Sequence, residues 1–183
     1  MSEPSREGDS RREEPSSESL LEPSSAEQSG EAFQILFVCT GNTCRSPMAE
    51  VLLRRGLQVK GWRAVTVRSA GVATGGGDPA SPGALEAAQA ADLDLSEHVS
   101  APLTLELLEW ADLILTMSPS HLERVRALGG GEKAMVLTAF AGSGLSSVSD
   151  PFGGPPALYR ETFQLLEELV EETLIRLEPI LNP

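Results

Sequence analysis

Short apolar runs alternate with longer amphipathic segments from Phe33 onward. The first run, Ile35 to Val38, is continuously apolar, which is typical of a buried strand in a parallel sheet. The pattern predicts further strands at residues 65–67, 112–116 and 134–137. It predicts helices at residues 47–57, 82–92, 104–110, 119–128 and 157–177, and a long loop at residues 138–156. This alternation predicts a doubly wound α/β domain: a four-stranded parallel sheet with helices on both faces.

Three of the predicted helices begin at the same Ser-Pro pair, with the serines at Ser46, Ser81 and Ser118. Serine is a favoured N-cap because its hydroxyl accepts a hydrogen bond from a free backbone N–H of the first turn. Proline fits the next position, which needs no N–H donor. We therefore expect each serine to cap its helix. Gly56 and Gly61 are expected to mark the end of the first of these helices.

Residues 1–30 differ in composition from the rest of the chain. They contain nine serines, eight acidic residues and three arginines, and no aromatic residue. Such a segment buries too little apolar surface to offset the entropy lost on ordering. We expect a disordered acidic tail at residues 1–30, followed by one folded domain at residues 31–183.

The formal net charge of the chain is −13, of which the tail carries −5 and the remaining residues −8. Nucleic acids and anionic membranes attract clustered Lys and Arg, so neither is expected as a partner. No apolar segment follows the charges of the tail, as it would in a secretory signal. Only two cysteines occur, Cys39 and Cys44, and no Cys/His spacing suits a metal ion. We expect a cytoplasmic protein without a metal or other cofactor.

The loop after the first predicted strand reads Cys-Thr-Gly-Asn-Thr-Cys-Arg-Ser, from Cys39 to Ser46. A loop that enters a helix presents unpaired backbone N–H groups, and the helix dipole adds positive potential. Gly41 and Asn42 tolerate the left-handed backbone that lets such a loop curl into an anion nest. The segment therefore predicts a phosphate-binding loop at the carboxyl end of the first strand.

Cys39 and Arg45 supply the candidate chemistry of this loop. Its positive field favours a thiolate, which makes Cys39 a candidate nucleophile for attack on phosphorus. Arg45 can present its planar guanidinium to two phosphoryl oxygens. The alternative for a single cysteine after a strand is an inert packing residue. The residues expected to contact the phosphoryl group are Thr40, Gly41, Asn42, Thr43, Cys44 and Ser46.

The segment from Val38 to Glu50 resembles the signature of the low-molecular-weight protein tyrosine phosphatases. Arg68-Ser69-Ala70-Gly71 and Asp150-Pro151-Phe152-Gly153-Gly154 resemble two further segments of that family, in the same order. The resemblance extends over about residues 33–177. It implies a phosphatase that forms a phosphocysteine intermediate on Cys39 and acts on a phosphorylated protein.

Within this family the chain resembles the bacterial protein arginine phosphatase branch. Tyrosine phosphatases of the family usually carry an aliphatic residue where Thr43 stands, and tyrosines after the Asp-Pro pair. Here Phe152 and two glycines follow that pair. The resemblance implies hydrolysis of phosphoarginine on proteins, with phosphotyrosine as the alternative substrate. The Gly/Ser-rich segment at residues 139–148 departs from the family pattern.

Asp150 gains a role only from the resemblance. An isolated Asp-Pro pair predicts a turn. The resemblance implies instead that Asp150 protonates the leaving atom and later deprotonates the attacking water. His98 and His121 stand among polar residues and are expected to be solvated. Trp110 and Tyr159 are expected to pack in the core.

Two remoter alternatives use the same loop. An arsenate reductase would need further cysteines to relay electrons, and none lies outside residues 39–44. A phosphate-binding module without catalysis would not need Cys39, Arg45 and Asp150 together. Cys44 could also trap an oxidised Cys39 as a disulfide.

Overall fold

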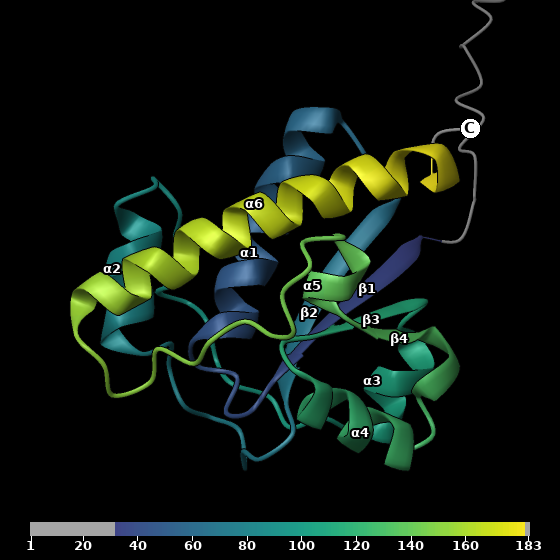
Figure 1. Ribbon diagram of the computed structural model, residues 1–183, viewed down its shortest axis with the longest axis horizontal. Coiled ribbons are helices and arrows are strands. Elements are labelled where there is room, and N and C mark those ends of the chain that lie inside the picture. Colours follow the sequence, from purple (N-terminus) through teal and green to yellow (C-terminus); the bar gives the residue numbers. More distant parts are fainter. Residues whose placement is uncertain (1–31, 182–183) are drawn as a thin grey trace, which may run out of the picture.

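The computed structural model describes residues 32–181, so the predicted tail at residues 1–30 lies outside the described residues. Its centre is a four-stranded parallel sheet in the order β2-β1-β3-β4 (Figure 1). The strands are β1 (Phe33–Cys39), β2 (Val65–Gly71), β3 (Leu113–Thr116) and β4 (Ala134–Val136). All four predicted strands and their parallel arrangement are confirmed.

Helices cover both faces of this sheet, as the alternating pattern predicted (Figure 1). They are α1 (Arg45–Lys60), α2 (Pro82–Gln89), α3 (Leu105–Trp110), α4 (Pro119–Ala127), α5 (Leu137–Phe140) and α6 (Pro156–Leu181). Side chains of β1 alternate between the faces. Ile35 and Phe37 belong to the core under α1, α2 and α6, whereas Leu36 and Val38 belong to the core under α3 and α4. Both faces of β1 are therefore buried, which explains its unbroken apolar run.

The strand order reverses at β1. Its neighbour in sequence, β2, lies on one side, and β3 lies on the other. Ligands of open α/β sheets bind outside the carboxyl ends of the strands at such a switch point. The loop from Cys39 to Arg45 leaves β1 at that end and enters α1.

The start of α1 differs from the prediction. The helix begins at Arg45, its N-cap is Cys44, and no side chain caps it. Ser46 lies inside the first turn with its hydroxyl 2.9 Å from the sulfur of Cys39. The expectation that Ser46 is the N-cap was therefore wrong. Ser81 stands at the N-cap of α2 without a capping bond, and only Ser118 caps as expected, by accepting from the His121 N–H.

The predicted helix ends also shift. Gly56 lies within α1, which continues to Lys60 and ends at Gly61 in the left-handed conformation. A Cβ at Gly56 would come 2.3 Å from a methyl carbon of Leu174, so this glycine allows α6 to approach α1 closely. α2 ends at Gln89, and α6 runs past residue 177 to Leu181. The predicted loop at residues 138–156 begins within the short helix α5.

None of the helices in residues 32–181 is both long enough and apolar enough to span a lipid bilayer.

Candidate active site

A cavity of about 200 Å³ lies at the carboxyl end of β1, within the loop that precedes α1. We call it the Cys39 cavity. It is lined by Cys39, Thr40, Gly41, Thr43, Cys44, Arg45, Asp150 and Phe152. The fold thus brings together all three residues predicted to be catalytic. Of the residues predicted to contact a phosphoryl group, Asn42 and Ser46 do not line the cavity but lie buried behind it.

The sulfur of Cys39 has two hydrogen-bond partners. The backbone N–H of Asn42 donates to it over 3.2 Å, and the Ser46 hydroxyl lies 2.9 Å away. Only 2% of Cys39 is exposed, yet its side chain lines the cavity. Donors fixed in this way interact most strongly with a negatively charged sulfur. Both contacts therefore hold the sulfur in place at the wall of the cavity.

Asn42 holds the curl of the loop from behind. Its φ of 55° is in the left-handed region, which asparagine adopts more readily than most residues. Its side-chain N–H₂ donates to Ser46 and to Ser69, both over 2.8 Å, and its carbonyl oxygen accepts from the Ala101 N–H. The ring of His98 bonds to its backbone oxygen over 2.7 Å. Every polar group of this buried residue except its N–H, which faces the Cys39 sulfur, is thereby used to fix the loop.

The segment from Arg68 to Gly71 supports the loop from β2. Ser69 accepts from Asn42 and donates to the buried carboxylate of Glu50. A Cβ at Gly71 would come 2.6 Å from the Thr40 backbone oxygen and 3.0 Å from the Asn42 backbone nitrogen. The glycine is therefore required by the close approach of the loop. The sequence indicates this segment only through its resemblance to the family, and its physical role comes from the fold.

Arg45 is the buried cation of the site. Its guanidinium donates to the Val148 backbone oxygen and to the Thr40 hydroxyl, each over 3.2 Å, and to the Asp150 carboxylate over 2.6 Å. Its Nε is buried, and no acceptor among the described residues reaches it. A buried donor without a partner is costly, and because Arg45 lines the cavity, a phosphoryl oxygen bound there is a candidate acceptor for this N–H.

Asp150 lies at the cavity mouth, on the loop between α5 and α6. Its side chain is 44% exposed and pairs with Arg45. One carboxylate oxygen also accepts from the Phe152 backbone N–H, so the turn expected from Asp-Pro is present together with the contact to Arg45. An ion pair needs the carboxylate, whereas a general acid must carry a proton. A phosphoryl group that takes over Arg45 would release Asp150 for that second role.

The two histidines are not the solvated side chains that were expected. His98 is half-buried against the Asn42 backbone. His121 is 5% exposed and lies between the Thr40 and Ser118 hydroxyls, 2.9 Å from each. The signal that could have found it is its position in the first turn of the helix after β3, near the carboxyl end of the strand, where side chains of a doubly wound fold reach the ligand site.

The remaining predictions concern packing residues and the second cysteine. Tyr159 is buried in the core and Trp110 packs against the opposite core, as expected. Cys44 is a free thiol, 3.1 Å from the Ser81 hydroxyl and 3.8 Å from that of Tyr159. Burial raises the pKa of Tyr159, which keeps its hydroxyl as a neutral partner of Cys44. Within residues 32–181, no three His, Cys, Asp or Glu side chains gather closely enough to hold a metal ion.

Comparison with known proteins places this cavity in a family. The sequence profile of the low molecular weight phosphotyrosine protein phosphatases matches residues 34–179. The chain belongs to this family. The match includes the loop from Cys39 to Arg45, the β2 segment and Asp150, so it covers all the residues that the fold gathers at the cavity.

Two relatives and one solved structure show where the chain lies within the family. A protein-arginine-phosphatase of Bacillus subtilis is 43% identical over 140 residues, 75% of this chain and 92% of that protein. A probable low molecular weight protein-tyrosine-phosphatase of Ralstonia nicotianae is 32% identical over 146 residues, 80% of this chain and 97% of the relative. A mutant of the YwlE arginine phosphatase with a phosphorylated active-site serine has a TM-score of 0.76 and 40% identity, and the match covers 80% of this chain and 96% of that one.

Proposed function

We propose that this phosphoprotein phosphatase hydrolyses phosphoarginine in proteins, with Cys39 as the nucleophile. The proposal is carried by one observation: Cys39, Arg45 and Asp150 line one cavity, and there the Arg45 guanidinium donates to the Asp150 carboxylate. Its substrate is supported by the 43% identity to a protein-arginine-phosphatase. The arginine phosphatase structure with a phosphorylated active-site serine supports a covalent phosphoryl intermediate.

In the first step, the Cys39 thiolate attacks phosphorus while Arg45 holds the phosphoryl oxygens. The backbone N–H groups of the loop add to this stabilisation, because the start of α1 favours negative charge. The bond from phosphorus to the guanidine nitrogen breaks, and Asp150 gives its proton to that nitrogen. The Ser46 hydroxyl, 2.9 Å from the sulfur, stabilises the thiolate before attack.

In the second step, water hydrolyses the phosphocysteine. Asp150, now a carboxylate, takes a proton from the water as it attacks phosphorus. The bond from sulfur to phosphorus breaks, and the electron pair returns to Cys39 as thiolate. Inorganic phosphate leaves, and Asp150 again bears a proton, so the catalyst is regenerated.

Thr43 and Phe152 are the residues we propose for recognition of the leaving group. Both line the Cys39 cavity, and Thr43 is half-buried whereas Phe152 is 73% exposed at its rim. A phosphoguanidinium brings N–H donors into the cavity, and the Thr43 hydroxyl can accept one of them. A phenyl ester has no such donor. The apolar ring of Phe152 offers a flat surface to the planar guanidinium.

The test compares two peptides of the same sequence, one with phosphoarginine and one with phosphotyrosine, by kcat/KM. A preference for phosphoarginine of at least about tenfold, or 1.4 kcal/mol, supports the proposal. Equal rates or a preference for phosphotyrosine would refute the substrate assignment while leaving the phosphatase chemistry intact. Phosphotyrosine is the second candidate, favoured by the 32% identity to a probable protein-tyrosine-phosphatase. We further propose a cytoplasmic location, which the small number of cysteines supports.

A further inference from the structure

His121 lies beside the Cys39 cavity without lining it. It stands in the first turn of α4, directly after β3, and its ring is almost entirely buried. Its Nδ1 is 2.9 Å from the Ser118 hydroxyl, and its Nε2 is 2.9 Å from the hydroxyl of Thr40. The ring therefore connects the capped start of α4 with the loop after β1. The proposed chemistry gives this histidine no role.

Thr40 carries the connection onward to Arg45. Its hydroxyl accepts from the Arg45 guanidinium over 3.2 Å. A guanidinium can only donate, so this contact occupies a lone pair of Thr40. Depending on its tautomer, the imidazole Nε2 either accepts a hydrogen bond from the Thr40 hydroxyl or donates one to the other lone pair of its oxygen. In both cases His121 determines how the hydroxyl turns, and with it the lone pair that faces Arg45.

Arg45 needs such a constraint. Its guanidinium has to stay in place at the phosphoryl site after Asp150 leaves the ion pair. Once Asp150 has left, the remaining partners of its guanidinium are the Val148 oxygen and the Thr40 hydroxyl. Val148 belongs to the long loop before α6, whereas Thr40 is held by His121 and, through it, by α4.

We propose that His121 is a positioning residue of the phosphoryl site, which orients Arg45 through the Thr40 hydroxyl. The role requires an uncharged ring, since a cation there would repel Arg45. Burial and, to a smaller extent, the positive charge of Arg45 lower the pKa of His121 against the opposing effect of Asp150, to about 4 in total, so the ring is neutral at physiological pH. The proposal rests on phosphoryl binding by the loop and not on phosphoarginine as the substrate.

The test uses variants that keep one of the two contacts of the ring. In H121N the amide can replace Nδ1 and retain Ser118, but it cannot reach Thr40. In H121Q the amide can replace Nε2 and retain Thr40. T40V removes the hydroxyl at nearly constant shape. For each variant we would measure inhibition by inorganic phosphate, and kcat and KM for an aryl phosphate, together with the melting temperature.

We expect H121N and T40V each to weaken phosphate binding about three- to tenfold, the usual worth of one hydrogen bond. H121Q should stay within about threefold of the unchanged protein, and H121N should cost nothing more in a T40V background. The loss in kcat/KM should be the same for good and poor leaving groups, because leaving-group protonation is not involved. The melting temperature of H121N is not the criterion, because a purely structural role would lower it as well. Only a positioning role makes the loss in phosphate binding disappear when the Thr40 hydroxyl is already absent.

H98L is the matched control. It also removes a histidine that contacts the loop, but through the Asn42 backbone, so its effect should add to that of T40V. Additive effects of H121N and T40V, or phosphate binding by H121N within about twofold of the unchanged protein, would overturn the proposal. Should H121N fail to fold, S118A takes its place in the same cycle, because it frees the ring from its other partner. Additivity of S118A with T40V then overturns the proposal, and non-additivity supports it.

Discussion

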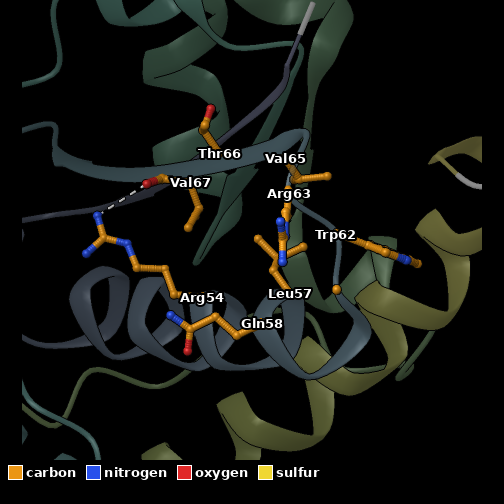
Figure 2. Close-up of a pocket in the computed structure, with 9 residues that line it drawn as sticks. Arg54, Leu57, Gln58, Trp62, Arg63, Val65, Thr66 and Val67 are labelled. Carbon is orange, nitrogen blue, oxygen red and sulfur yellow. Dashed lines mark hydrogen bonds between the residues drawn. The ribbon is translucent and has the colours of Figure 1, made fainter. Parts of the chain in front are cut away.

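Two hollows of this molecule differ more in chemistry than in size. The larger, about 580 Å³, lies between the second half of α1 and the edge strand β2, and Figure 2 shows its lining. We call it the α1–β2 hollow. It is lined by Arg54, Leu57, Gln58, Gly61, Trp62, Arg63, Val65, Thr66 and Val67. The Cys39 cavity has about 200 Å³ and holds the residues of the proposed reaction.

The polar groups of the two hollows are arranged differently. In Figure 2 the Arg54 side chain turns to the Val67 backbone oxygen, and it also pairs with Glu50. In the Cys39 cavity the buried Nε of Arg45 has no acceptor among residues 32–181, and Cys39 and Asp150 line the same cavity. Such a donor is costly unless a ligand satisfies it. Convergent, unsatisfied polar groups therefore mark a site better than volume does.

The largest expected effect tests which of the two hollows is the active site, by changing one residue in each. C39S should abolish turnover of an aryl phosphate without changing the fold, because a serine hydroxyl is not ionised in the loop. R63A, in the α1–β2 hollow, should change kcat/KM by less than about twofold, as is usual for an exposed residue remote from the chemistry. Substantial hydrolysis by C39S would remove Cys39 as the nucleophile, and a large loss in R63A would make the larger hollow functional.

The next largest effect is expected at the cavity mouth. D150N should lower the rate by about 10²–10⁴, the usual contribution of general acid catalysis. The loss should shrink for substrates with very good leaving groups, which need little protonation. Single-turnover rates on aryl phosphates of graded leaving-group acidity would measure this. A rate equal to that of the unchanged protein on a poor leaving group would exclude Asp150 from the mechanism.

The contrast between local and distant contacts also explains what the sequence could predict. The strand β1, the loop and the helix after it are encoded by a continuous run of residues, so their pattern was sufficient. Asp150 is 105 positions from Arg45, and Thr40 is 81 positions from His121. No periodicity reports such pairs. The resemblance to a family assigned Asp150 to the site, but both pairs required the fold.

Local rules failed where a tertiary contact competed with them. Ser46 has the right neighbours for an N-cap, but its hydroxyl bonds to Cys39 and Asn42 instead. Gly56 was read as the end of α1, but it lies inside the helix because Leu174 of α6 occupies the space of a side chain. In both cases the local sequence favours one role for the residue, and a contact made in the folded protein gives it another.

Substrate choice can be tested within the Cys39 cavity itself. T43I should shift preference from phosphoarginine toward phosphotyrosine. Thr and Ile are both β-branched, so the backbone should tolerate the exchange. The aliphatic chain would leave an N–H of the guanidinium unpaired, which costs about 1–3 kcal/mol, or roughly one to two decades in the ratio of kcat/KM values. A ratio within about threefold of the unchanged protein, which is less than 1 kcal/mol, would show that Thr43 does not set specificity.

The smallest expected effect is on stability. It concerns His121, which is buried beside the Cys39 cavity, in contrast to the exposed Arg63 of the α1–β2 hollow. The pKa of His121 falls from the ordinary 6.5 to about 4 in the folded protein, chiefly because the ring is buried. Above pH 6.5 the ring is neutral whether the chain is folded or unfolded, so it adds no pH dependence. As the pH falls from 6.5 toward 4, the His121 ring binds a proton in the unfolded chain but not in the folded protein. Stability therefore decreases, by at most about 1.4 kcal/mol per pH unit.

H121L cannot bind this proton in either state. The difference in free energy of unfolding between the unchanged protein and H121L should therefore move in favour of H121L as the pH falls through this window. Urea unfolding at several pH values would measure it. Because Asp150 acts on the ring, the pair of proteins should also be compared in a D150N background, so that titration of that carboxyl cancels. A difference that does not change with pH would mean that folding does not lower the pKa of His121, and burial beside the Cys39 cavity would then have no effect on its protonation.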